Sequence, residues 1–398
     1  MSILFIPGWY PNRTGLTLGN FIQKHAEAAA PYAEVTVVNA CADERLINAE
    51  YEVIVSQENG VNVIQVYYKK VLSGNGFFSS LKKLKRNLKA HLIGYRKMAE
   101  AGGKPDLLHM NILNKAGLIC FYLKLRYGLN YVYTEHWTGF LEENPLFKPY
   151  SLTGSIYRMI AGRSKMILPV TVNLKNALIR NGIKGRFRII GNVVDTDLFK
   201  PNTETKTETG DPAKSSFRFI HISHAFDEQK NISGILRAVE KLKNIRPDFI
   251  LQIISDGVTD QHKTYAEELG ILDKQVYFEG TKSTKEVAHE LGKAQCLVLF
   301  SNYENLPCVI PEAMACGVPI LSSNVGGIAE HVSPEMGILV SPRNDNELAM
   351  AMKKMMEQYA SFSQQKLRAY SVRNFSYDQI GLALKEVYSE FVNISDSK

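Results

Sequence analysis

Two glutamates beside a predicted helix start are the residues of this sequence best suited to binding a polar ligand. They follow an apolar run, Cys296–Phe300, that is typical of a buried strand. Pro307 marks the first helical turn, so Glu304 falls on the preceding loop and Glu312 one to two turns into the helix. The free N–H groups of a helix start suit a phosphate, and carboxylates accept hydrogen bonds from neutral hydroxyls such as those of sugars. A capping residue and an ordinary helix glutamate are the simpler alternative.

Three further positions next to predicted strands or helices bear on the argument. Lys230 lies close after the predicted strand Phe217–Ser223, where a surface lysine at a helix start is the alternative. His136 ends a predicted buried strand, where a histidine is often purely structural. Gly19 and the adjoining Asn20 open the first predicted helix after a loop that contains proline and glycine. Glycine permits close approach of the backbone to a ligand, although it also suits an ordinary helix start.

The elements that must position these residues alternate along the first half of the chain. Short apolar runs rich in β-formers are separated by segments of helical length and period, such as 20–30 and 115–127. Two of the predicted strands flank Glu58-Asn59-Gly60 and are expected to form a hairpin. The predicted strands are Ser2–Ile6, Glu34–Asn39, Tyr51–Ser56, Val61–Tyr67, Leu107–Met110, Tyr131–Thr134, Met166–Leu168 and Phe187–Ile190.

The alternation stops at 201–216, which lacks large apolar residues, and then starts again. Helices are expected to begin near Ile232, Gln261, Thr284, Pro307, Gly327 and Asn346, and helical segments end the chain. Apolar strands without polar alternation indicate parallel sheets covered on both faces, so each half is predicted to be a doubly wound α/β unit. The second set of predicted strands is Phe217–Ser223, Phe249–Ser255, Gln275–Phe278, Cys296–Phe300, Pro319–Ser322 and Gly337–Val340.

Composition agrees with two soluble α/β domains. The 398 residues are 45% hydrophobic and 22% charged, which excludes a disordered chain, a collagen and a disulfide scaffold. No apolar run approaches the ~20 residues of a membrane span, and the start does not resemble a signal peptide. Five cysteines without a CxxC motif indicate reduced thiols and a cytoplasmic location. The net charge of +7 is uneven, because the first 200 residues are strongly basic and the remainder is mildly acidic.

The stretch Phe77–Met98 concentrates part of that basic charge. Apolar residues recur in it at helical spacing, and Lys or Arg fill much of the rest. One interpretation is a helix packed on the first sheet with a solvated charged face. The other is a surface that contacts anionic lipid headgroups. A nucleic-acid partner is not expected, because no binding motif accompanies the stretch and its aromatic residues lie only at the ends.

Several motifs together resemble the family 4 glycosyltransferases. Glu304-x7-Glu312 is followed by Ala313-Met-Ala-Cys-Gly-x-Pro and then by Gly326-Gly-x-x-Glu, as in that family's signature. The segment Ile190–Pro201 is similar to the end of the family's first domain. Val276-Tyr-Phe-Glu-Gly280 is similar to the segment that borders the nucleobase, and Phe375-Ser-Tyr to the start of the closing helix. The match spans nearly the whole chain and is weaker before residue 130.

The resemblance implies the GT-B architecture, with two Rossmann-like domains facing across a cleft. Their expected bounds are 1–200 on the acceptor side, 201–216 for a linker, 217–375 for the nucleotide-sugar side and 376–398 for a helix that returns to the first domain. It also implies a retaining glycosyltransferase of the hexosyltransferase type that uses a UDP- or GDP-sugar and no metal. The acceptor would be a saccharide or a lipid-linked molecule, in polysaccharide or glycolipid synthesis. The enzyme would be cytoplasmic, with a possible peripheral place on the inner membrane face.

The resemblance also implies roles for individual residues. Catalytic roles fall to Glu304 on the donor sugar, to Lys230 on the diphosphate and to His136 near the donor. Glu312 would bind the ribose hydroxyls. The remaining expected binding positions are the backbone near Asn305, Leu306 and Cys308, the nucleobase border at Gly280 and the loop at Gly19 and Asn20.

Departures from the family pattern and alternative functions also follow from the sequence. Ala225 stands where the family often has an arginine, so a second diphosphate contact is missing from the motif. Asp195-Thr-Asp197 has the form of a metal motif of another fold but falls in a loop segment. No GxGxxG follows a strand, which argues against a dehydrogenase. A sugar-nucleotide epimerase, a hydrolase or a non-catalytic sugar-nucleotide-binding protein remain alternatives.

Overall fold

The computed structural model describes residues 1–70, 77–202 and 216–392. The chain forms two compact units. Unit 1 comprises residues 1–140, 145–193 and the chain from Tyr377 onward, and unit 2 comprises residues 141–144 and 194–376. The expected linker 201–216 lies almost entirely outside the described residues. The sequence placed the first boundary at residue 200, whereas the contacts divide the chain after Val193.

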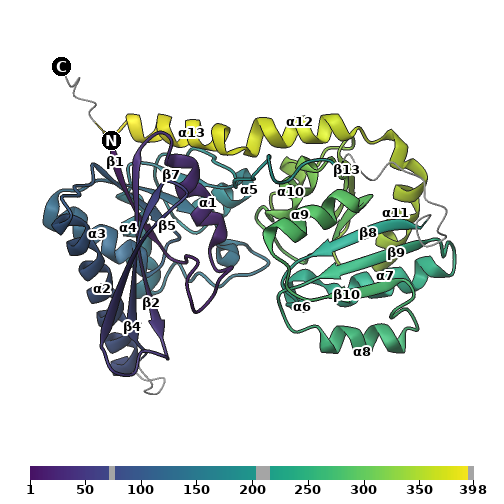
Figure 1. Ribbon diagram of the computed structural model, residues 1–398, viewed down its shortest axis with the longest axis horizontal. Helices are drawn as coiled ribbons and strands as arrows, with labels where there is room; N and C mark the ends of the chain where they lie inside the picture. The colour runs from purple at the N-terminus through teal and green to yellow at the C-terminus, as the bar shows by residue number, and fades with distance from the viewer. Residues whose placement is uncertain (71–76, 203–215, 393–398) are drawn as a thin grey trace. The chain divides into compact units, whose positions relative to one another are not determined.

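Unit 1 is built on a seven-stranded sheet in which all neighbouring strands are parallel except one pair (Figure 1). The exception is the predicted hairpin, whose turn residues Asn59 and Gly60 both have positive φ, as a tight hairpin turn requires. The strands, in spatial order, are β3(Tyr51–Glu58), β4(Val61–Lys69), β2(Glu34–Asp43), β1(Ser2–Pro7), β5(Leu107–Asn111), β6(Tyr131–Glu135) and β7(Ile167–Pro169).

Helices cover both faces of this sheet. Val35 and Val37 of β2 join α1 in one core, whereas Val38 points the other way and contacts Gly94 of α2. The last helix of the described chain, α13, packs on α1 and adds Ile380 and Leu384 to the α1 side, as the family resemblance implied for a returning helix. The unit 1 helices are α1(Asn20–Ala29), α2(Phe77–Glu100), α3(Lys115–Tyr127), η1(Thr138–Phe140), α4(Leu152–Gly162), α5(Val172–Arg180) and α13(Tyr377–Ser389).

Unit 2 is built on a six-stranded, wholly parallel sheet. Its order places the first strand in the middle, as in a doubly wound Rossmann-like fold. The strands, in spatial order, are β10(Val276–Glu279), β9(Phe249–Ile254), β8(Phe217–Ile222), β11(Cys296–Leu299), β12(Ile320–Ser323) and β13(Gly337–Val340).

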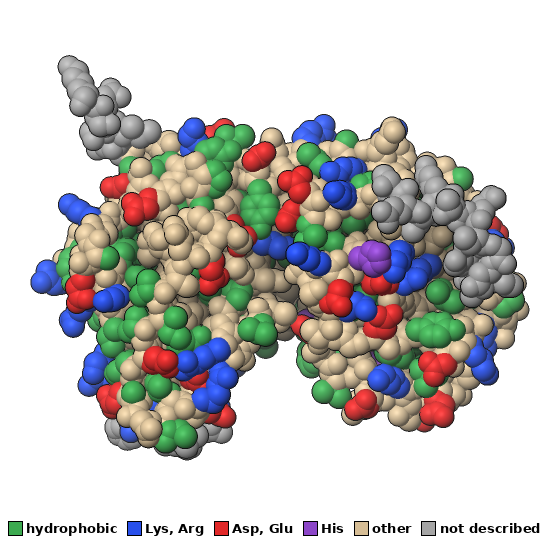
Figure 2. All heavy atoms as spheres, viewed as in Figure 1, with side chains coloured by type: hydrophobic (Ala, Val, Ile, Leu, Met, Phe, Trp, Pro, Cys, Tyr) green, Lys and Arg blue, Asp and Glu red, His purple; other side chains and the backbone are tan. Residues whose placement is uncertain are grey.

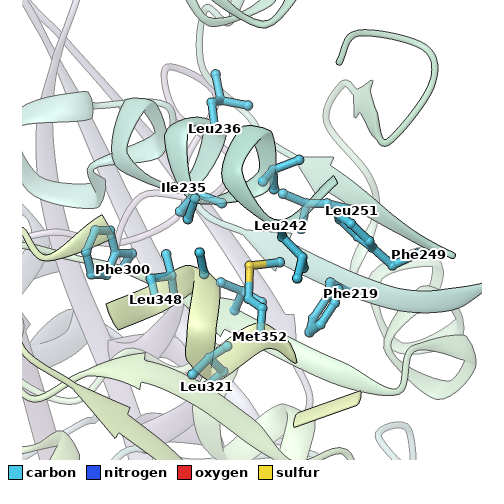
Figure 3. Close-up of a cluster of buried hydrophobic side chains, with 14 of the residues drawn as sticks. Phe219, Ile235, Leu236, Leu242, Phe249, Leu251, Phe300, Leu321, Leu348 and Met352 are labelled. Carbon is cyan, nitrogen blue, oxygen red and sulfur yellow. The ribbon is translucent and has the colours of Figure 1, made fainter. Parts of the chain in front are cut away.

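One face of the unit 2 sheet is closed by α7 and α11, whose side chains meet Phe219, Leu251 and Leu321 in a fully apolar core (Figure 3). The opposite face is covered by a second cluster that includes α9, α10 and α12. The helices are α6(Asp227–Lys230), α7(Ile232–Lys243), α8(Asp260–Glu268), α9(Thr284–Lys293), α10(Val309–Ala315), η3(Ile328–Glu330), α11(Asp345–Gln358), η4(Tyr359–Ser361) and α12(Gln364–Phe375).

Two predicted elements are wrong. Phe187–Ile190 is not a strand, because only Phe187 makes a single parallel bridge, to Ile167. The helix expected near Gly327 is only the three-residue turn η3, since the chain soon enters β13. The helix expected from Pro307 begins two residues later, at Val309. None of the helices in the described ranges is long and apolar enough to cross a membrane.

The basic stretch at 77–98 forms most of α2, which packs on β2 and β4. Asn87 donates to the Ala40 carbonyl and lies buried, while Lys82, Lys85 and Lys97 are exposed on the other side. The prediction of a helix packed on the first sheet with a charged outer face is therefore confirmed. Contact of that face with a membrane stays a prediction. On the side of the molecule seen in Figure 2, acidic and basic side chains are interspersed over both units.

Candidate functional site

The candidate donor site lies where the strand order of the unit 2 sheet reverses. Parallel sheets of this kind bind ligands at the carboxyl ends of the two strands that flank the reversal, because the loops there diverge. In unit 2 these strands are β8 and β11, which are neighbours. Lys230 follows β8 and Glu304 follows β11. The two residues that the sequence singled out separately therefore come from the two loops that a doubly wound sheet brings together.

Lys230 and Glu304 form a buried ion pair. The Lys230 ammonium donates to Glu304 Oε1 at 2.5 Å, and the side chains are 9% and 6% exposed. Burial of one charge without the other would be strongly unfavourable, so each group fixes the other. An ammonium has three N–H donors, and this pair uses one of them. Lys230 can therefore hold Glu304 and still donate to an anionic ligand.

Two further side chains orient the Glu304 carboxylate. Ser301 Oγ donates to Oε1 at 2.8 Å, and the Gln229 amide approaches Oε2 at 3.4 Å. Sequence analysis did not single out either residue. The available signal was weak: Ser301 is a small polar residue directly after a buried strand, and Gln229 precedes the candidate lysine.

Gly326 packs directly against the backbone of the loop that carries Glu304. Gly326 has φ +57°, and a Cβ placed on it would lie 1.7 Å from the Glu304 carbonyl oxygen. The neighbouring Gly327 N–H donates to the Asn305 carbonyl at 2.9 Å. The Gly-Gly pair of the motif thus serves as a backbone support for the Glu304 loop, because no side chain fits between the two segments.

The other predicted donor-site residues of unit 2 occupy the same edge of the sheet. Asn305 and Leu306 are buried on the Glu304 loop, and Cys308 is half-buried just before α10. Glu312 is 9% exposed and lies in the first turns of α10. Gly280 directly follows β10, is exposed, and has open space where a Cβ would stand. The structure places these residues, but their contact with a nucleotide sugar stays a prediction.

The loop after β8 is held by a separate polar cluster. Asp227 accepts hydrogen bonds from Ser233 N–H and Oγ, both at 2.8 Å, and lies 3.2 Å from His262 Nε2. Burial acts to raise the pKa of Asp227, but the bonds to His262 and Ser233 outweigh it and lower the pKa to about 2. Ala225 packs against Gly257, whose missing side chain leaves room for it. Ala225, at the position that often carries an arginine in the family, therefore packs closely against the backbone of a neighbouring loop.

Unit 1 brings its own predicted residues together at the carboxyl ends of β1 and β6. Gly19 has φ +72° and lies against the Trp9 backbone, so this position has no room for a side chain and requires glycine. Asn20 is exposed at the start of α1. The next residue, Phe21, packs on the His136 ring with centroids 4.5 Å apart. Burial, aided by the nearby His25 and His109, holds the pKa of His136 well below its usual range, and the hydrogen-bond interaction of its ring with Asn192 only partly opposes this.

A buried carboxylate fixes the backbone beside His136. Glu135 accepts hydrogen bonds from the N–H groups of His136 and Trp137 at 2.8 Å, from Leu113 N–H at 3.0 Å and from the Tyr133 hydroxyl. Burial raises the pKa of Glu135, although these four donors act in the opposite direction. Glu135 thus ties the end of β6 to the loop after β5. The sequence analysis did not assign it a role.

The Asp-x-Asp segment behaves as a loop element. Asp195 Oδ1 accepts from the N–H groups of Asp197 and Leu198, at 3.1 and 3.0 Å. In the described part of the chain, no group of three His, Cys, Asp or Glu side chains is placed to hold a metal ion. All five cysteines are free thiols, and Cys120, Cys296 and Cys316 are buried.

Comparison with known families covers both halves of the chain. A family model described as glycosyltransferase family 4 matches residues 22–198. A second model, described as glycosyl transferases group 1, matches residues 205–373. The two matches together leave out only the ends of the chain and a few residues between them.

Comparison with individual proteins also finds glycosyltransferases and structures of the same fold. An uncharacterized glycosyltransferase of Methanocaldococcus jannaschii is 26% identical over 293 residues, which cover 72% of this chain and 75% of the relative. The sucrose-phosphate synthase of Thermosynechococcus elongatus has a TM-score of 0.77 at 20% identity over 98% of both chains. HepE of Anabaena, solved in complex with UDP, has a TM-score of 0.70 at 18% identity, over 98% of this chain and all of HepE. At these identities the two structures show a shared fold.

Proposed function

Because this chain belongs to the group 1 and family 4 glycosyltransferases and has their GT-B fold, we propose that it moves a hexosyl group from a UDP- or GDP-sugar to an acceptor hydroxyl, with retention of anomeric configuration and without a metal ion. The observation that carries the proposal is the buried pair between Lys230 and Glu304 at the strand-order reversal of unit 2. A cation held in a low-dielectric site stabilises the charge that develops on a leaving diphosphate.

The proposed roles are those that the family resemblance implies for these positions. Lys230 neutralises the diphosphate, and Glu304 accepts hydrogen bonds from hydroxyls of the donor sugar. Glu312 binds the ribose hydroxyls, while the backbone around Asn305, Leu306 and Cys308 surrounds the sugar and the diphosphate. Gly280 borders the nucleobase. In unit 1, His136 and the loop at Gly19 and Asn20 face the donor and the acceptor.

The proposed reaction needs no covalent enzyme intermediate. The bond from the sugar C1 to the diphosphate oxygen breaks, and the acceptor oxygen forms the new bond to C1 on the same face. The acceptor hydroxyl gives its proton to the departing diphosphate oxygen. The protein contributes orientation and charge stabilisation, which together can supply most of the rate enhancement of a group transfer.

Unit 1 is the proposed acceptor side, and its basic character suits an anionic acceptor. The exposed lysines of α2 form the proposed contact with an anionic membrane, which fits a cytoplasmic enzyme at the inner face of a membrane. Polysaccharide or glycolipid synthesis is the corresponding pathway class. The solved complex of the structural relative HepE with UDP supports a UDP-sugar as the first donor to test.

A binding screen followed by product analysis tests the proposal. UDP- and GDP-sugars are added singly, and the thermal unfolding midpoint is measured. A ligand at 100 times its Kd stabilises the folded state by about 2.7 kcal/mol. The stabilising donor is then incubated with candidate acceptors, and the anomeric configuration of the product is read by NMR. Retention supports the proposal. Inversion, or donor binding without transfer to any saccharide or lipid acceptor, contradicts it.

A further inference from the structure

A cavity of about 530 Å³ opens at the carboxyl ends of the unit 1 strands, a volume typical of small-molecule sites. Both tryptophans of the chain line it: Trp9 follows β1 and Trp137 follows β6. Phe147 and Tyr157 come from the loop before α4 and from α4 itself. None of these four residues belongs to the donor site proposed above.

The lining favours an apolar ligand over a free sugar. Seven of the twelve lining residues carry large apolar or aromatic side chains. Of the polar ones, Asn114 and Ser151 already cap helices, accepting from the N–H groups of Ala116 and Gly154 at 2.9 Å. A sugar site needs several polar groups that converge on hydroxyls. Here Lys148 is the only charged residue in the lining.

The backbone at the cavity carries strain. Ile112, which lines the cavity, has φ +70°, an uncommon conformation for a β-branched residue. Its position is fixed because its N–H donates to the Thr134 carbonyl at 2.9 Å and its carbonyl accepts from the Asn114 N–H at 2.9 Å. Strain of this kind persists where the surrounding structure over-determines it, and it concentrates at ligand sites.

The rim of the cavity is exposed and apolar. Leu146 lines the cavity and is 59% exposed, and Tyr150 and Leu152, next to lining residues, are 89% and 81% exposed. Leu152 continues along α4 to Ile156 and Met159, at helical spacing, as an exposed apolar face. Exposed apolar surface of this kind marks a site of interaction with a partner or a membrane.

The basic residues around the rim of the cavity favour an anionic partner. The fifty residues from 145 to 194 contain nine Lys or Arg and no Asp or Glu. Lys148, Arg163 and Lys165 are exposed. Arg188 pairs with Glu386 of α13, and Arg186 pairs with Glu390 directly after that helix. Glu142 and Glu143, which directly precede this stretch, are exposed and acidic, but the chain from Glu142 to Val194 keeps a clear excess of basic residues. An apolar cavity with an apolar rim and predominantly positive surroundings matches an amphiphile that joins a hydrocarbon chain to a phosphate.

We propose that this cavity binds the hydrocarbon chain of an anionic lipid, with the lipid phosphate at Lys148. The inference deepens the proposed function, on which it rests only in naming this lipid as the class of acceptor. The helices α2, α3 and α4 contact one another in series, so the basic face of α2 belongs to the same helical layer as the rim of the cavity.

Intrinsic tryptophan fluorescence tests the site directly, because both tryptophans line it. The full chain is titrated with monomeric dioctanoyl phosphatidic acid, without any nucleotide sugar. We expect a saturable change in emission, an affinity at least tenfold weaker for dioctanoyl phosphatidylcholine, and no saturable change with inorganic phosphate or glucose 1-phosphate. No saturable response to phosphatidic acid, or an equal response to any of the three controls, overturns the proposal.

Matched variants locate the site. Lys148→Gln should weaken phosphatidic acid binding roughly three- to tenfold, because one charge-assisted contact is lost, while Lys165→Gln should change it less. Leu146→Gln should weaken binding of the chain, and Leu125→Gln, at an exposed leucine of α3 outside the cavity, should not. Equal effects within either pair overturn the assignment. Lipid binding without glycosyl transfer would defeat only the proposed function, and transfer without lipid binding only this inference.

Discussion

Gly326 touches the backbone of Glu304 so closely that a methyl group on it would overlap the Glu304 carbonyl oxygen, at 1.7 Å. We expect Gly326→Ala to displace the Glu304 loop and to lower stability by roughly 2–4 kcal/mol, since the residue also has a positive φ. Donor binding should fall further than stability alone explains. Gly280→Ala is the stability control, because nothing lies near its Cβ position. Equal melting temperatures for the two variants would show that the Gly326 contact is not needed.

Lys230 and Glu312 should differ in their kinetic effects. Lys230→Ala removes a cation that acts on charge developing in the transition state, so kcat should fall roughly 10²–10³-fold. Glu312→Ala removes a contact that is similar throughout the reaction, so KM should rise while kcat changes little. Steady-state kinetics with varied donor measure both. A folded Lys230→Ala enzyme with normal kcat would refute the assignment.

Because Lys230 and Glu304 form a buried pair, measurements of stability test their interaction independently of the kinetics. Removal of one partner alone leaves a buried uncompensated charge and should cost about 3–5 kcal/mol of stability. The double variant Lys230→Met with Glu304→Gln should lose less stability than the sum of the two single variants. Additive losses in urea unfolding would mean that the two groups do not interact in solution.

Transfer should not need a divalent cation. We expect activity to survive EDTA, because Lys230 supplies the positive charge and Asp195 is occupied by backbone N–H groups. Initial rates are measured before and after chelation and dialysis. Activity that is lost with EDTA and returns with Mn²⁺ or Mg²⁺ would show that the proposal of a metal-free mechanism is wrong.

Unit 1 should lose stability in mild acid through His91 of α2. Burial lowers the pKa of His91 from 6.5 to about 4. The unfolded chain therefore binds a proton below pH 6.5 that the folded protein does not bind until about pH 4, so stability falls as pH falls through this window. Between pH 6.5 and 5.0 the loss should be roughly 1.5 kcal/mol.

Variants at two histidines separate this effect from general acid sensitivity. His91→Gln should make the unfolding midpoint depend less steeply on pH, although other buried histidines such as His136 still contribute. His289→Gln, at an exposed histidine of α9, should leave the dependence unchanged. Thermal unfolding is followed by circular dichroism at pH 6.5 and 5.0. If the His91 variant keeps the wild-type slope, the neutral buried histidine does not govern this window.

The outer face of α2 should contribute to binding of anionic vesicles. Changing Lys82, Lys83 and Lys85 to Gln should weaken cosedimentation and reduce its salt dependence, since each basic residue near the surface contributes ~1 kcal/mol. Arg86 is better left in place, because it donates to the Lys69 carbonyl and so ties α2 to β4. Nucleotide-sugar binding by unit 2 should be unchanged. Wild-type protein that does not cosediment at low salt would identify this face as merely solvated.

The sequence predicted the parallel strands and the hairpin well, because these depend on local apolar patterns and on turn residues such as Gly60. It named Lys230 and Glu304 but not their ion pair, since the two lie 74 residues apart and meet only through the strand order. Ser301 and Gln229 escaped notice for the same reason. The segment at 187–190 has the composition of a strand, yet only one of its residues bridges to β7. Local propensity cannot reveal whether a segment pairs along its whole length with the edge strand of a sheet, here β7.

The return of α13 to unit 1 affects how the protein can be made. During synthesis, residues 194–376 emerge before α13. At ~5–20 residues per second, synthesis of this segment takes roughly 10–40 s. Throughout that interval, the α1 side of unit 1 lacks Ile380, Leu384 and Tyr388, and His109 lacks the Tyr388 hydroxyl that lies 2.7 Å from it in the folded protein. Unit 2 has all its own residues as soon as Ser376 has emerged. The C-terminal unit can thus mature first, while the nascent N-terminal unit waits with an open apolar face that chaperones can bind.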